Sequence, residues 1–144
     1  MDNIKVVKIW QDEDFFEISV TCENKMISAS TKVYATDLKI EQLQNEISQF
    51  LQHKKSEIFW ASGERGESST PCVEFRFFMK DSGGHVLIEC FMELDDGGNL
   101  DKHNCCFFVD AELGMLHDFN SKLSALKTSQ LGVSASFLDE AEWV

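Results

Sequence analysis

The sequence predicts an α+β fold in which an antiparallel, strongly curved sheet of about seven strands packs against two helices. Apolar and polar residues alternate over most of the chain, as they do in strands with one buried face. Helical spacing replaces this alternation in two segments. The strands come in runs that short turns can join, which favours antiparallel pairing. The expected order is β-β-β-α-β-β-β-β-α.

An antiparallel meander is expected at the start of the chain. Residues 4–10 form its first strand, and residues 15–22 alternate cleanly between apolar and polar side chains. The acidic segment 12–14 supplies the turn between them. Residues 26–33 alternate in the same way and form the third strand.

A helix is predicted over residues 37–53. Ile40, Leu43 and Ile47 recur at helical spacing and mark its buried face. Thr36 is the expected N-cap, because its side-chain oxygen suits the unpaired backbone N–H groups of a first turn.

Strands and a second helix fill the rest of the domain. The strands are expected over residues 58–61, 73–80, 86–94 and 104–109. The last helix is expected to begin near Asp110, as N-cap, and to continue to Lys127. We assign residues 1–128 to a single α+β domain. Residues 129–144 are expected to form an acidic, mobile C-terminal tail, since Gly132 interrupts the pattern and no basic residue follows Lys127.

The charge balance limits the classes of binding partner that are expected. Asp and Glu number 25 against 13 Lys and Arg, a formal net charge of −12 on 144 residues. Such a field repels nucleic acid and anionic membranes and attracts basic proteins. The sequence has neither the apolar stretch of a membrane span nor that of a signal peptide. We therefore expect a cytoplasmic protein with a basic protein partner, no nucleic-acid or membrane partner, and an oligomeric state left open between monomer and dimer.

No cofactor or metal site is predicted. The five cysteines have no C-x-x-C spacing and are expected to be reduced, structural thiols. The four histidines lack metal-ligand spacing. The turn at residues 95–101 is rich in Asp, but Gly97 and Gly98 occupy positions where a calcium loop needs ligands.

A partner-binding surface is predicted on the outward sheet face formed by two neighbouring strands and in the turn that follows them. Its seven residues are Glu74, Glu89, Glu93, Asp95, Asp96, Asp101 and Phe91. The carboxylates would steer a basic partner, and the aromatic ring would anchor it. Phe15, Phe78 and Phe91 all fall on nominally polar strand faces. They either pack beneath a helix, which we favour, or form exposed contacts.

The order of these patterns over residues 4–127 resembles a family of small acidic immunity proteins. The matching segments are Phe16-x-Ile18-x-Val20, Asp37-Leu38 before a helix with Leu43 and Phe50-Leu51, Val73-x-Phe75-x-Phe77, and Glu112-Leu113 before Phe119, Leu123 and Leu126. This is the order in immunity proteins of bacterial polymorphic-toxin loci, in the group similar to the WapI immunity proteins. The resemblance implies a non-enzymatic protein that occludes the active site of a cognate toxin, often a basic nuclease domain. It assigns no individual binding residue.

Other function classes stay open. The chain is either such an inhibitor, a small-molecule-binding or assembly module that uses a Phe-rich concave sheet face, or an enzyme with an unrecognised site. In the last case sheet carboxylates would act with His85 or His103 as acid and base.

Overall fold

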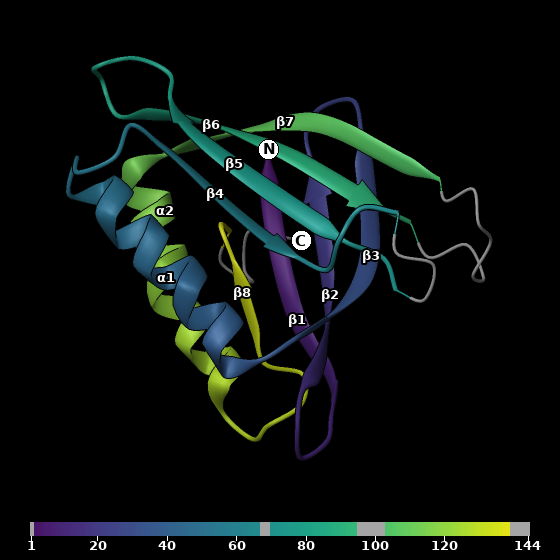
Figure 1. Ribbon diagram of the computed structural model, residues 1–144. Coiled ribbons are helices and arrows are strands. Elements are labelled where there is room, and N and C mark those ends of the chain that lie inside the picture. The colour runs from purple at the N-terminus through teal and green to yellow at the C-terminus, as the bar shows by residue number, and fades with distance from the viewer. Residues whose placement is uncertain (1, 67–69, 95–102, 139–144) are drawn as a thin grey trace.

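The computed structural model describes residues 2–66, 70–94 and 103–138 and confirms the α+β class. It has two antiparallel four-stranded sheets and no single strongly curved sheet (Figure 1). The first sheet has the order β3-β2-β1-β8, and the second has the order β4-β5-β6-β7. The predicted curved sheet is therefore wrong. Alternation shows which face of a strand is buried, but not which strands are neighbours.

The strands have the following bounds. The first sheet contains β1 (Asn3–Gln11), β2 (Phe16–Glu23), β3 (Ser28–Ala35) and β8 (Ser134–Ser136). The second contains β4 (Glu57–Ser62), β5 (Val73–Met79), β6 (His85–Glu93) and β7 (Asn104–Glu112). The chain passes from one sheet to the other through the first helix, between β3 and β4, so the full order is βββαββββαβ.

The C-terminal segment belongs to the first sheet. β8 pairs antiparallel with β1, with Val6 opposite Ala135. Phe137 and Leu138, which follow β8, are buried. The sequence predicts no strand here, because Ser-Ala-Ser offers a single small apolar residue and no alternation long enough to recognise.

The first helix, α1 (Asp37–Leu51), begins where the sequence predicts. Thr36 caps it, and its Oγ1 accepts a hydrogen bond from the backbone N–H of Lys39 at 3.2 Å. The second helix, α2 (Leu113–Lys122), begins later than predicted, and a 3-10 helix, η1 (Leu123–Lys127), continues it. The expected N-cap at Asp110 is wrong because β7 runs on to Glu112 and places Ala111 in the core.

A single core lies between the sheets and the helices. It joins the inner faces of both sheets to the buried sides of α1 and α2. Figure 1 shows α1 and α2 side by side along one side of the two sheets. The outer faces of the sheets turn away from this core and carry half-exposed aromatic side chains, Trp10 and Tyr34 on the first sheet and Phe59 and Phe108 on the second. These outer faces position the candidate sites.

No helix among the described residues is long and apolar enough to cross a membrane.

Candidate interaction surfaces

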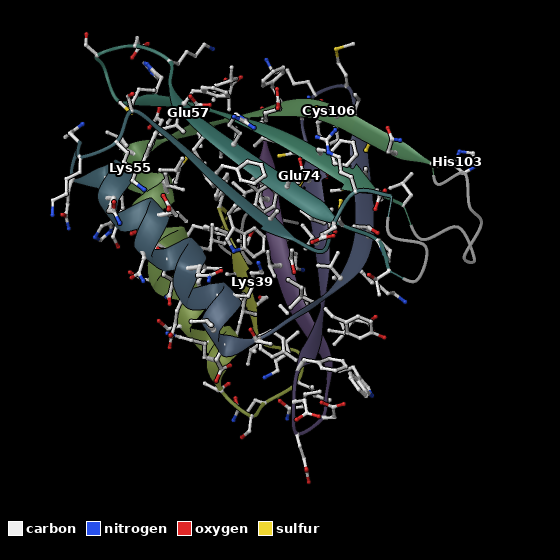
Figure 2. All side chains as sticks on the ribbon, viewed as in Figure 1. Lys39, Lys55, Glu57, Glu74, His103 and Cys106 are labelled. Carbon is white, nitrogen blue, oxygen red and sulfur yellow. The ribbon has the colours of Figure 1, made fainter. Side chains whose placement is uncertain are left out.

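The outer face of the second sheet holds the predicted site. Strand register places Phe59, Arg76, Glu89 and Phe108 in one row across β4, β5, β6 and β7. The adjacent row contains Ala61, Glu74, Phe91 and Cys106. We call these two rows the second-sheet face. Figure 2 shows Glu74 and Cys106 over this sheet.

Arg65 contacts two of the predicted partner-binding residues, Glu74 and Phe91. Its guanidinium donates to both carboxylate oxygens of Glu74, from Nε at 3.0 Å and from one terminal nitrogen at 2.8 Å. The same guanidinium lies over the ring of Phe91, 3.6 Å from its centroid. The hydrogen bonds to Glu74 raise the pKa of Arg65. Phe91 is consequently buried, but beneath Arg65 of a loop and not beneath a helix as the favoured alternative predicts. For Phe15, which is 37% exposed, that alternative is wrong.

The other predicted partner-binding residues differ in their surroundings. Glu89 is half-buried and lies opposite Arg76 in register, while Arg76 forms an ion pair with Glu57 at 3.0 Å. Glu93 is buried, and its Oε2 accepts a hydrogen bond from the backbone N–H of Gly66 at 3.0 Å. Asp95, Asp96 and Asp101 lie outside the described residues. The structure thus brings Glu74, Glu89 and Phe91 together on one face.

The thiols near this face are not activated nucleophiles. Burial raises the pKa of Cys72 to about 12, and neighbouring Glu93 adds to the effect. The pKa of the exposed Cys106 is also raised, chiefly by desolvation and then by Glu89. A raised pKa keeps a thiol protonated near neutral pH, where nucleophilic attack requires the thiolate.

The histidines proposed for an acid–base site lie apart. His85 begins β6 and His103 precedes β7, so they lie at opposite ends of this antiparallel pair. Nδ1 of His85 is 2.8 Å from Oδ2 of Asp81 in an exposed turn. This hydrogen bond, with a second one from the backbone N–H of Gly83, lowers the pKa of Asp81. Within the described ranges, no three His, Cys, Asp or Glu side chains are grouped so that they could hold a metal ion.

The Phe-rich inner face of the second sheet serves packing. Phe75 stacks on Trp60 with ring centroids 5.8 Å apart. The ring of Phe77 packs against that of Phe50 in α1, with centroids 6.3 Å apart. All four side chains are buried. The concave face expected for a small ligand therefore contributes to the core.

A second surface, which the sequence did not predict, lies at one end of the first sheet. Trp10, Phe15 and Tyr34 form an aromatic cluster there, with ring centroids separated by 6.0, 6.3 and 5.0 Å. Their exposed fractions are 44%, 37% and 44%. We call these three residues the aromatic corner.

A β-bulge places Trp10 in this cluster. Lys8 lies opposite Ile18 and Trp10 opposite Glu17, so Ile9 is an extra residue in β1. In a regular strand Trp10 would share the inner face with Ile4 and Val6, since side chains alternate. The bulge shifts the phase and turns Trp10 to the outer face. There Glu17 lies between Trp10 and Tyr34 in register.

Carboxylates surround the aromatic corner. They come from the β1–β2 turn, from β2 and from the first turn of α1: Asp12, Glu13, Asp14, Glu17 and Asp37. In the part of the chain that the structure describes, none of the five forms an ion pair. An open hollow of about 390 Å³ adjoins them and is lined by Asp12, Asp14, Phe15, Asp37 and Leu38 among others.

Internal contacts hold this end of the molecule in place. Oδ1 of Asp12 accepts from the backbone N–H groups of Asp14 and Phe15 at 2.8 and 3.0 Å. Nε2 of Gln11 donates to the backbone carbonyl of Ser129 at 2.6 Å. Lys8, at the floor of the hollow, is buried and donates to the carbonyls of Leu126 and Thr128. The positive charge of Lys8 is thus turned inward.

Comparison of the chain with protein-family models, curated proteins and solved structures gives no significant match. A fold by itself does not define an activity, so the function is inferred from the surfaces described above.

Proposed function

We propose that this chain is a non-enzymatic acidic binding protein that docks a basic protein partner and covers its functional surface. The observation that carries the proposal is found at one end of the first sheet, where exposed aromatic rings lie beside carboxylates that form no ion pair with any other described residue. The resemblance to immunity proteins suggests a toxin domain as the partner.

The physics of association supports this role. A net charge of −12 speeds the encounter with a basic protein and disfavours acidic ones. Aromatic side chains provide most of the affinity once the surfaces meet, because they bury a large area at a low cost in conformational entropy. Carboxylates on the docked surface would also occupy positions that substrate phosphates take in a nuclease.

The test is to produce the chain together with the protein encoded beside it in the genome. We expect a stable complex whose dissociation constant rises with ionic strength, and rescue of growth when that neighbour is toxic to cells. A neighbour that is basic and toxic, but neither binds the chain nor is neutralised by it, would contradict the proposal.

A further inference from the structure

We infer that the aromatic corner, with the hollow beside it, is the docking surface for a Lys- and Arg-bearing segment of the partner protein. The inference rests on the proposed function and adds the place of contact and the chemistry of the contacting segment. It is carried by three features of this end of the molecule: exposed rings, unpaired acids and a fixed shape.

The composition of the corner is that of an interaction hot spot. Trp and Tyr are enriched where binding energy concentrates, and Trp10 and Tyr34 are both 44% exposed. Each ring of the corner contacts the other two, edge-on or tilted. Since the rings are already packed together, little side-chain freedom remains to be lost on binding.

The charge around the rings selects a cationic partner. Asp12, Glu13, Asp14 and Glu17 come from the turn and the strand that carry Phe15, and Asp37 lies across the hollow. On the adjoining strands, Lys8 is committed to two backbone carbonyls, and Lys32 lies one row further along β3, opposite Ser19. Lys127 also lines the hollow, but its Nζ forms an ion pair with Oε1 of Glu41 at 3.8 Å. A Lys or Arg side chain could pair with these acids while it lies over Trp10 or Tyr34.

The same charge argues against a second copy of this chain as the occupant. A symmetric dimer through the corner would bring two identical sets of carboxylates together. Like charges that face each other across an interface disfavour the complex strongly. A basic segment removes that cost.

The second-sheet face differs from the aromatic corner in how its charges are paired. It also exposes aromatic side chains, and Phe59 and Phe108 are each 45% exposed. Most of its charges, however, are matched within the chain: Arg65 pairs with Glu74, and Arg76 pairs with Glu57 and lies over Phe59. Glu89, opposite Arg76 in register, is the one charged residue of the two rows that forms no ion pair with another described residue. A basic partner would have to compete with these arginines, so this face serves as the control.

The first experiment maps contacts without the natural partner. A hexa-arginine peptide is titrated into the isotope-labelled chain, with a hexa-glutamate peptide as control, and amide and indole shifts are followed by NMR. We expect the largest shifts at the Trp10 indole, the Tyr34 amide and the amides of residues 12–17, in the β1–β2 turn and the start of β2. Shifts centred on Glu89 and Phe108, shifts spread evenly over the acidic surface, or no shifts at all would overturn the inference.

The second experiment compares matched variants against the partner identified by co-production. Trp10→Ala/Tyr34→Ala is compared with Phe59→Ala/Phe108→Ala, and circular dichroism verifies that each variant is folded. Truncating two hot-spot rings should weaken binding by about tenfold or more, and truncating the control pair by less than about threefold. Equal losses, or a larger loss for the control pair, would overturn the inference.

Two double variants that remove the same number of charges separate the contribution of charge from that of ring packing. Glu13→Gln/Asp14→Asn and Glu64→Gln/Glu112→Gln each remove two exposed carboxylates from the surface. We expect the first pair to slow association more than the second. If the partner binds the wild type and all variants equally, the docking site is wrong but the proposed function stands. If the partner does not bind the wild type, both fail.

Discussion

The ring of Phe137 packs edge-on against the ring of Phe119, with centroids 4.9 Å apart and planes at 80°. This contact joins the segment after β8 to α2. Both side chains are buried, so the C-terminal segment up to Leu138 contributes to the core.

The Phe137→Ala variant should therefore be clearly less stable than the wild type. Loss of a buried phenylalanine typically lowers the free energy of unfolding by about 3–5 kcal/mol. Urea denaturation measures the change. Leu131→Ala is the control, because Leu131 is exposed and its truncation should change stability by less than about 0.5 kcal/mol. Equal stability of the two variants would contradict the packing of this segment.

Gly63 should not tolerate a side chain. Its φ is +83°, and an added Cβ would lie 2.7 Å from the backbone oxygen of Pro71. Gly66 has a similar φ of +79° but nothing within 4 Å of its Cβ position. Gly63→Ala and Gly66→Ala should share the backbone strain of about 1 kcal/mol, and Gly63→Ala should lose additional stability through the clash. Identical thermal midpoints for the two variants would refute this account.

Thiol reactivity should follow exposure and pKa. Cys106 is exposed, whereas Cys72 is buried with its pKa raised to about 12. In the native protein at pH 8, iodoacetamide should modify Cys106 first and leave Cys72 unmodified until the chain is unfolded. Peptide mapping by mass spectrometry identifies the labelled site. Rapid native labelling of Cys72 would show that its surroundings are open.

Asp81 should titrate below its ordinary pKa of 3.8. Its carboxylate accepts hydrogen bonds from His85 and from the backbone N–H of Gly83, which favour the charged form. Because the folded-state pKa is depressed, the stabilisation is present above the unfolded pKa and is lost as pH falls through the folded value. In NMR titrations, His85→Ala should raise the pKa of Asp81 toward 3.8. No change in the variant would assign the effect to Gly83 alone.

Much of the fold follows from local patterns. Seven of the eight strands and α1 with its Thr36 cap lie where alternation and helical spacing predict them. These features depend on side chains within one element. The division into two sheets depends instead on which strands pair across the α1 connection, and β8 depends on contact with β1. Such long-range pairings leave no local periodicity.

The candidate site was less accessible to sequence reasoning. The sequence places Phe15 on a polar strand face beside Asp-Glu-Asp, which leaves exposure of its ring as one of two alternatives. The sequence does not reveal that Trp10 is exposed, because Trp10 continues the alternation of the inward-facing Ile4 and Val6 and only the bulge at Ile9 reverses it. Conversely, the burial of Phe91 depends on Arg65 from a distant loop, which the strand pattern does not reveal.

Stopped-flow fluorescence can measure the association rate constant with the basic partner as a function of ionic strength. If unpaired carboxylates guide the partner to the aromatic corner, the rate should fall by about tenfold or more between low and high salt. A rate constant that is independent of salt, for a partner that nevertheless binds tightly, would show that the carboxylates do not guide the partner to the aromatic corner.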